Sequence, residues 1–192
     1  SPGSDTANLS VLGYDPAIYY TGRSPLEAIS MGIELGPNDV AMRCNLVTLS
    51  DAEDIADTTM VDYSAGEITT EESAQLIESV RKSIRSNKVD LFSGISYRHC
   101  LVLRDAETGS ICTPPHDISG RPIREYLPKG RYGDSLLELM ELSRKILRDH
   151  PVNKARIAKG LHPANSCWFW GEGTSPSLPR FEDKFGLRGT VI

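Results

Sequence analysis

The sequence predicts an α/β fold of the α+β type, in which helices cover a mixed, partly antiparallel sheet. Two observations support this class: strand-like runs alternate with amphipathic helical stretches, and neighbouring strands lie close enough to form hairpins. A chain of 192 residues, 39% hydrophobic and 24% charged, is typical of a globular protein with a buried core. We therefore expect one main domain with short flanking segments.

The first helix is predicted at Ser24. This serine is the expected N-cap, Pro25 takes the first helical position, and Glu27 completes a capping box. Gly36 and the proline that follows it end a helix of about three turns. The apolar positions in helical register are Leu26, Ile29 and Ile33.

Val40–Leu49 is predicted to be a strand with two different faces. Because side chains alternate along a strand, Arg43 and Asn45 share one face with Ala41 and Val47. The opposite face is more apolar. We therefore expect this strand to be half-buried, with the polar pair facing a cleft or solvent.

The middle of the chain is predicted to hold a short strand, a helix and a pair of strands. A short strand is predicted at Met60–Tyr63, and the Thr69–Glu72 segment forms a second capping box that starts a helix. Two further strands, Val89–Ser96 and Arg98–Arg104, are expected to be joined at or near Gly94.

The last part of the chain is predicted to hold a loop, two helices and strands. Ser110–Gly133 is rich in proline and glycine, and a connection of this length is usually functional. Asp134–His150 has the strongest helical periodicity, and Pro151 is expected to end that helix. The other predictions are a helix at Val152–Lys159, a strand at Ser166–Trp170, a linker at Gly171–Pro179 and a strand at Leu187–Ile192.

Charge and residue usage argue against several classes of protein. A net charge of −5 disfavours non-specific binding to nucleic acid, and no apolar run approaches the roughly 18 residues of a membrane span. No secretory leader is visible, so we expect a cytoplasmic protein with neither a nucleic-acid nor a membrane partner. The cysteines, none of them in a Cys-x-x-Cys pair, are Cys44, Cys100, Cys112 and Cys167. We expect them to be reduced and mostly buried.

Ser4 is the first candidate for chemistry. It lies in a Pro-Gly turn just before a short apolar stretch, where a helix start would favour a phosphate or an oxyanion. This placement suits a nucleophile that accepts a phosphoryl group. Nothing before it in the chain supplies groups that would activate it.

Two polar clusters are candidates for binding an anion. Arg98 and His99 stand at the head of an apolar strand, where a guanidinium fork and an imidazole donor would meet a phosphate or a carboxylate. His116, Asp117 and Arg121 lie on a loop stiffened by two prolines. The alternatives are a surface ion pair for the first cluster and ordinary turn chemistry for the second.

Three more residues complete the candidates. Arg43 and Asn45 point to one side of their strand, and Arg23 precedes a predicted helix start. For each of them, an exposed polar role is the alternative. The Trp168–Trp170 segment is expected to pack in the core, and no self-contained metal or nucleotide motif is present.

Taken in order, these motifs resemble a known enzyme family, the archaeal-type 2,3-bisphosphoglycerate-independent phosphoglycerate mutases of the alkaline phosphatase superfamily. The resemblance covers nearly the whole chain. The motifs that carry it are Pro2–Asp5, Leu12–Pro16, Tyr20–Ala28, Arg43–Thr48, Asp62–Gly66, Ser96–His99, Pro114–Asp117, His150–Asn153, Pro163–Asn165 and Trp170–Gly173.

The resemblance implies a phosphatase-like core and an inserted domain that closes over the substrate. Ser4 matches the serine that takes the phosphoryl group from 3-phosphoglycerate and that also touches a metal. The family's two divalent metals would be Mn or Mg, with Zn or Co as alternatives. Residues 1–22 match a stub of the core, 23–185 the inserted domain, and 186–192 the return to the core.

The same resemblance implies a small phosphorylated carboxylic acid as substrate, and it sharpens the list of binding residues. Glu67 stands where the family pattern suggests histidine, and the family's other metal-ligand segments are not found in the chain. We therefore expect no metal in this chain and no mutase activity from it alone. A phosphonate or phosphate-ester hydrolase and a non-catalytic anion-binding domain are the alternatives. The expected substrate-binding residues are Arg23, Arg43, Asn45, Arg98, His99, His116, Asp117 and Arg121.

Overall fold

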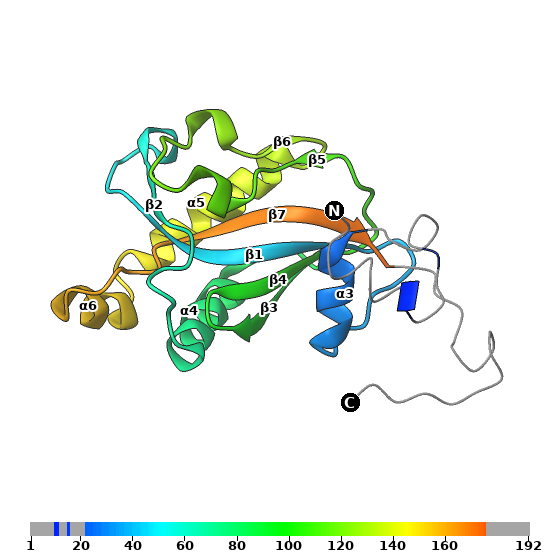
Figure 1. Cartoon of the computed structure of the whole chain (residues 1–192), viewed down its shortest axis with the longest axis horizontal. Coiled ribbons are helices and arrows are strands. Elements are labelled where there is room, and N and C mark those ends of the chain that lie inside the picture. The colour runs from blue at the N-terminus through cyan, green and yellow to red at the C-terminus, as the bar shows by residue number, and fades with distance from the viewer. Residues whose placement is uncertain (1–9, 12–14, 16–21, 176–192) are drawn as a thin grey trace.

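The computed structural model of the chain describes residues 10–11, 15 and 22–175. Figure 1 shows strands crossing the middle of the molecule with helices packed around them. The helices are α3 (Arg23–Ser30), α4 (Thr70–Ser83), α5 (Gly133–Leu147) and α6 (Pro151–Ala158). The strands are β1 (Val40–Leu49), β2 (Met60–Asp62), β3 (Val89–Ile95), β4 (Arg98–Leu103), β5 (Ser110–Ile111), β6 (Lys129–Gly130) and β7 (Ser166–Thr174).

The main sheet is built around β1. This strand pairs with β4 along one edge and with β7 along the other, while β2 pairs with its last residues and β3 extends the sheet beyond β4. Each ladder among the described strands is antiparallel. The expected α+β class with a partly antiparallel sheet is therefore confirmed.

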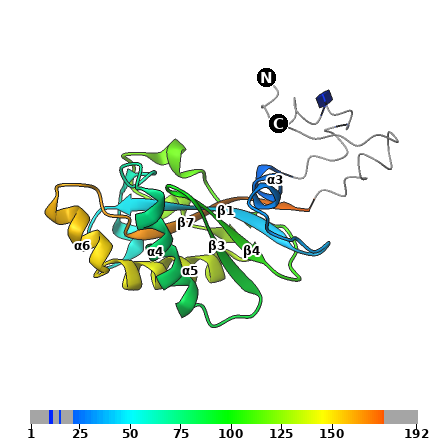
Figure 2. The same ribbon diagram turned by 90° about the horizontal axis from the view of Figure 1, so that it is seen from below.

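Helices cover both faces of this sheet, as Figure 2 shows with α3 on one side and α4 and α5 on the other. Met42 and Leu46 of β1 pack with Leu76 of α4 and Met140 of α5 in the main core. On the opposite face Ala41 packs with a smaller apolar cluster that includes α3. The prediction of a half-buried strand is wrong, because both faces of β1 are covered and only Arg43 reaches partial exposure.

The β3–β4 hairpin turns at Ser96 and Tyr97, just after the expected joint. Ser96 adopts a left-handed φ of 55°, and its hydroxyl donates to the carbonyl of Ile68 at 2.7 Å. Gly94 lies instead in an irregular part of the ladder, where a Cβ would collide with the carbonyl oxygen of Arg98. Glycine is needed here for close backbone approach and not for the turn itself.

The two predicted capping boxes have different outcomes. The Thr69 box at the start of α4 is confirmed, with the hydroxyl of Thr69 accepting from the backbone of Glu72. The box at Ser24 is wrong: the cap residue is Gly22, the Ser24 hydroxyl donates to the carbonyl of Gly171, and α3 has only eight residues. A long-range bond to β7 has replaced the local one.

The predicted helix at Val152–Lys159 is confirmed as α6, which begins one residue earlier, at Pro151. α5 stops at Leu147, and His150 then caps α6 by accepting a hydrogen bond from the Val152 amide at 3.2 Å. Proline takes the first helical position, where no backbone donor is needed.

The segment predicted as one long loop, Ser110–Gly133, contains the β5–β6 ladder and two short 3₁₀ helices at Pro115–Ile118 and Arg124–Tyr126. β7 continues through Gly171 to Thr174, so a linker does not begin at Gly171. Cys44, Cys100, Cys112 and Cys167 are all free, as expected. Within the described ranges, no helix combines the length and apolarity that a membrane crossing requires.

Several predictions fall on residues outside the described ranges. These are the role of Ser4, the strand at Leu187–Ile192 and the predicted boundary at residues 185 and 186.

Candidate functional site

Two adjoining hollows on the α3 side of the sheet share Arg43, His116 and Trp170. We call them together the arginine groove. The larger, about 340 Å³, is also lined by Gly22, Arg23, Ser24, Gly171 and Glu172. The smaller, about 130 Å³, is also lined by Asn45, Tyr63, Tyr97 and Arg98. The groove therefore gathers residues from segments far apart in the sequence.

Strand register brings the polar residues of the groove to one face. Asn45 of β1 lies directly opposite Arg98 of β4, and Arg43 lies opposite Trp170 of β7. Residues directly opposite in an antiparallel ladder project from the same face. The β1 alternation recognised in the sequence thus sets the floor of the groove, and pairing with β4 and β7 supplies the rest.

The guanidinium group of Arg43 contacts a carboxylate along its edge and an aromatic ring on its flat face. Its Nε and Nη2 donate to the two carboxylate oxygens of Glu27 in α3, at 2.9 and 2.8 Å. Its guanidinium lies over the Trp170 ring, 4.4 Å from the ring centroid. Only 13% of the side chain is exposed. A paired and stacked arginine of this kind is rigid and positioned before any ligand arrives.

Asn45 ties three segments together below the surface. Its Oδ1 accepts from the indole nitrogen of Trp170 at 3.0 Å, and its Nδ2 donates to the carbonyl of Tyr63 at 3.1 Å. The residue is only 4% exposed. Its amide therefore holds Trp170 and Tyr63 in place, and its two described hydrogen bonds are structural.

His116 and three aromatic rings form the wall above the sheet. The His116 ring packs edge-on against Trp170 at 5.3 Å between centroids and against Tyr63 at 6.1 Å. Tyr63 in turn packs against Tyr97 at 6.0 Å. Sequence reasoning identified His116 but assigned Trp170 to the core and did not single out either tyrosine. The tyrosines lie in the motif segments Asp62–Gly66 and Ser96–His99, which was the signal available.

Arg98 is the cation of the groove that is open to a ligand. It is exposed, and across residues 22–175 no carboxylate lies within ion-pair distance of its guanidinium. Its recorded neighbour is the Tyr97 ring, 5.9 Å from the guanidinium carbon. An unpaired guanidinium at the mouth of a small aromatic hollow is suited to a carboxylate or phosphate.

Arg23 also lines the groove but, in contrast to Arg98, it pairs with a carboxylate. Its Nε donates to Glu27 Oε1 at 3.0 Å, so the Glu27 carboxylate contacts both Arg23 and Arg43. Glu27 was expected only to cap its own helix. No local pattern indicates that it bridges two arginines, because one of them comes from β1.

His99 lies on the other face of β4 from Arg98, contrary to their grouping as one cluster. It is 4% exposed, and its Nδ1 accepts from the Gly94 amide at 3.0 Å. Burial lowers the pKa of His99 to about 3, so its ring is uncharged at neutral pH. Period-two alternation, applied to Arg98 and His99, would have separated them.

Asp117 and Arg121 do not line the groove either. Asp117 is exposed, with its Oδ1 3.6 Å from Nε2 of His116. Arg121 stacks on Tyr126 at 5.4 Å and lines a separate hollow near the Arg124–Tyr126 turn. The 3₁₀ helix at Pro115–Ile118 turns the chain between His116 and Arg121, so the loop does not present them together.

The turn that carries Tyr63 is held in an unusual backbone conformation. Ala65, Gly66 and Glu67 have positive φ angles of 49°, 65° and 50°. The Asp62 carboxylate accepts from the Ser64 and Gly66 amides, at 2.8 and 2.9 Å. Burial alone would raise the pKa of Asp62, but these hydrogen bonds and one from His162 (2.9 Å) outweigh it and lower the pKa. Glu67 itself does not reach the groove lining.

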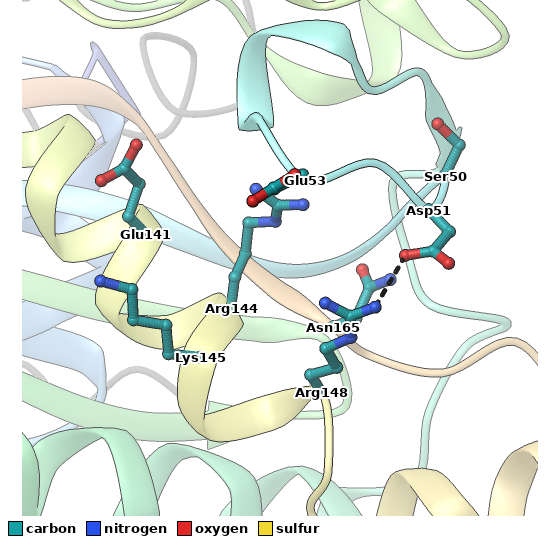
Figure 3. A pocket seen from close by; sticks show the side chains of 8 residues that line it. All are labelled: Ser50, Asp51, Glu53, Glu141, Arg144, Lys145, Arg148 and Asn165. Atoms are coloured by element: carbon teal, nitrogen blue, oxygen red, sulfur yellow. Dashed lines mark hydrogen bonds and ion pairs between the residues drawn. The ribbon is translucent and has the colours of Figure 1, made fainter.

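A further hollow, about 240 Å³, lies at the far end of β1 against α5. Figure 3 shows side chains of α5 facing the segment that follows β1. Its basic residues are matched by acidic ones, and Arg148 pairs with Asp51 at 3.4 Å. Arg144 donates to the carbonyl of Ala52. The lining residues are Ser50, Asp51, Glu53, Glu141, Arg144, Lys145, Arg148 and Asn165. Because its charges are compensated, this hollow is a weaker anion site than the groove.

A protein-bound metal ion needs several ligating side chains gathered at one point. Within residues 22–175, together with 10, 11 and 15, no three His, Cys, Asp or Glu side chains gather in a way that could hold a metal ion. The described part of the chain therefore does not by itself fit a two-metal centre.

Comparison with known proteins places this chain in a family. The family model for 2,3-bisphosphoglycerate-independent phosphoglycerate mutase matches residues 1–153. The chain is 50% identical to the enzyme of that name from Methanothrix thermoacetophila and to a probable one from Geobacter sulfurreducens, aligning in full to each. It spans about half of these relatives, 47% of their length.

A solved structure agrees with this assignment. The cofactor-independent phosphoglycerate mutase from Thermoplasma acidophilum superposes with a TM-score of 0.71 at 29% identity, over 94% of this chain and 49% of that one. The fold, the ordered motifs and the family match point the same way. The chain therefore belongs to the family of 2,3-bisphosphoglycerate-independent phosphoglycerate mutases.

Proposed function

We propose that this chain supplies the substrate-holding part of an enzyme that interconverts 3-phosphoglycerate and 2-phosphoglycerate. The observation that carries the proposal is Arg98, which has no carboxylate partner among residues 22–175, beside the preorganised Arg43 and His116 in a groove of a size suited to a small anion. Family membership supplies the reaction. Its name also implies that 2,3-bisphosphoglycerate is not needed as a cofactor.

Each groove residue has a distinct part in this proposal. Arg98 binds an anionic group of the substrate through its guanidinium, and His116 and Tyr63 offer polar contacts at the wall of the groove. Arg43 contributes positive potential from a fixed position. His99, Asp117 and Arg121, which lie outside the groove, are left out of the substrate contacts.

Ser4 is the proposed nucleophile, on the strength of its motif. Its Oγ attacks the phosphorus of 3-phosphoglycerate, the bond from phosphorus to the 3-oxygen breaks, and a phosphoserine forms; the proton lost by the serine hydroxyl is balanced by the one that the 3-oxygen gains as it leaves. The retained glycerate then turns, and its 2-hydroxyl attacks the phosphoserine to release Ser4. Holding the glycerate between these steps is the work we assign to the groove.

The two divalent metals implied by the family, Mn or Mg with Zn or Co as alternatives, would lower the pKa of the serine and neutralise phosphoryl charge when bound. We propose that their ligands, apart from Ser4, lie in the half of the relatives that this chain does not span. In this arrangement residues 1–22 and 186–192 belong to a phosphatase-like core, and 23–185 to an inserted domain of a cytoplasmic enzyme.

The test is Arg98→Ala in the full-length protein. Loss of the only groove guanidinium without a described carboxylate partner should lower kcat/KM for 3-phosphoglycerate at least tenfold, about 1.4 kcal/mol. An enolase-coupled assay measures the rate. Arg121→Ala is the matched control, because it removes an arginine that stacks on Tyr126 outside the groove, and should change kcat/KM less than twofold.

Two outcomes would contradict the proposal. Equal effects of the two substitutions would remove the special role of Arg98. Release of free phosphate in place of 2-phosphoglycerate by the parent enzyme would show that the glycerate is not retained, and would favour a hydrolase built on the same scaffold.

A further inference from the structure

Glu27 occupies the edge of Arg43 that an anionic ligand would otherwise take. Its Oε2 accepts from Nε of Arg43 at 2.9 Å and its Oε1 accepts from Nη2 at 2.8 Å, a bidentate pair. Oε1 also accepts from Arg23 at 3.0 Å. Carboxylates and phosphates prefer this two-pronged geometry. A substrate anion therefore cannot reach the same edge of Arg43 without breaking a pair that already exists.

The pair also fixes what lies beyond Arg43. The guanidinium is stacked on Trp170, whose indole nitrogen donates to Asn45 and whose ring packs against His116. Glu27 in α3 is thereby connected through Arg43 to the ring that shapes both hollows. With the Arg43 side chain only 13% exposed, the pair is shielded more than a typical surface ion pair.

We infer that Glu27 is a positioning residue of this enzyme. It holds Arg43 as a platform for Trp170 and directs the substrate's anionic group to Arg98. The negative charge of Glu27 disfavours an anion at the α3 end of the groove, and Arg98, without a carboxylate partner in the described part of the chain, attracts one at the other end. The inference rests on the proposed function for the identity of the substrate, but its geometric part does not.

Glu27→Gln in the full-length protein removes the charge at nearly constant shape. It places an amide donor opposite the donors of Arg43, so the bidentate pair is lost and Arg43 becomes a second uncompensated cation. We expect kcat to fall at least tenfold as the groove loses its fixed shape. We also expect inorganic phosphate, used as a competitive inhibitor, to bind at least threefold more tightly.

Two variants frame this result. Glu27→Asp keeps the charge on a shorter side chain. Its kcat should lie between those of Glu27→Gln and the parent, and its inhibition constant for phosphate should be close to the parent's. Glu78→Gln is the matched control: Glu78 also pairs with an arginine, Arg81 at 2.7 Å, but on the exposed face of α4 and away from the groove. It should leave both constants within twofold of the parent.

A spectroscopic readout separates positioning from catalysis. The indole ¹H–¹⁵N resonance of Trp170, assigned by its loss in Trp170→Phe, reports on the contacts of this ring with Arg43 and Asn45. It should shift in Glu27→Gln and stay in place in Glu78→Gln. This measurement does not depend on turnover.

The outcomes are distinguishable. An unmoved resonance with kcat and phosphate inhibition within twofold of the parent would overturn the inference and leave Glu27 as a surface ion pair. A shifted resonance with unchanged phosphate inhibition would overturn its role in directing the anion. If Glu27→Gln behaves as expected while Arg98→Ala is neutral, the positioning role stands and the proposed function of Arg98 fails.

Discussion

The two histidines near the Arg98 strand differ because of burial. His116 is half-exposed at the groove wall, whereas His99 is buried opposite Cys44 on the core face of the sheet, with its Nε2 buried and without a described hydrogen-bond partner. A buried imidazole loses the hydration that would stabilise its charged form, so it stays neutral. Two residues of one type, only seventeen positions apart in the sequence, thus have different chemistry.

His99 should make the stability of the fold dependent on pH. Its pKa is about 3 in the folded protein against an ordinary 6.5, so below pH 6.5 the unfolded chain binds a proton that the folded chain does not. The free energy of unfolding should therefore fall between pH 6.5 and about 3, by about 2 kcal/mol at pH 5. Urea unfolding at pH 7 and pH 5 measures this loss.

His99→Gln is the comparison for that experiment, because glutamine keeps an acceptor for the Gly94 amide but does not titrate. The loss from pH 7 to pH 5 should be smaller by about 2 kcal/mol in this variant. His150, whose pKa burial also lowers, remains in both proteins. An identical pH dependence of parent and variant would contradict the assignment to His99.

At the scale of the element, the β3–β4 hairpin sets where Arg98 stands. Ser96 stabilises its turn with two hydrogen bonds. The Ser96 hydroxyl donates to the carbonyl of Ile68, and the Ser96 amide donates to Oγ1 of Thr70 at 3.1 Å. Next to it, Gly94 allows the backbone of β3 to approach the carbonyl of Arg98 more closely than any side chain would permit. The position of the guanidinium therefore depends on a residue with no side chain.

Gly94→Ala should destabilise the protein by about 3 kcal/mol, because the new methyl group collides with backbone that has no rotamer to change. Gly32→Ala is the control: its φ of 76° is strained for alanine, but no atom lies within 4 Å of the new methyl. It should cost about 1 kcal/mol. Urea unfolding of both variants decides between collision and strain, and equal losses would show that the hairpin yields at Gly94.

At the scale of the whole molecule, the arginine groove exists only where α3, β1, β4, β7 and the Pro115–Ile118 turn meet. Arg23 and Trp170 are separated by most of the chain and yet line one hollow. Unfolding of any of these elements would dissolve the site. Ligand affinity and global stability should therefore be coupled.

We predict that these 192 residues alone do not turn over 3-phosphoglycerate. The groove holds a substrate group, but the chain spans only about half of its relatives, and the metal ligands are proposed to lie in the other half. An enolase-coupled assay with manganese, run beside the full-length protein, measures this. Turnover by the shorter chain would place the complete catalytic machinery within it and would contradict the proposed division.

Local rules account for much of the fold. The bounds of β1, the strand positions of β3 and β4 and the capping box of α4 follow from alternation and from the Thr69–Glu72 spacing, since each depends on residues a few positions apart. The same rules failed at Ser24, because its hydroxyl donates to the carbonyl of Gly171 in β7 and does not cap α3. At Pro151 the local rules held: α5 ends before it, and the expected second helix follows, starting at Pro151 itself.

Patterns along the chain were enough to identify the family, the strands β1 to β4 and the face of β1 on which Arg43 and Asn45 stand. Tertiary structure alone decided which candidates meet: Arg98, Arg43 and His116 share the groove, His99 faces the core, Arg121 lies elsewhere, and Glu27 and Trp170 join without a local signal. The physical reason is range. Periodicity and capping arise from neighbours in the chain, whereas an ion pair across α3 and β1 arises only when the sheet has assembled.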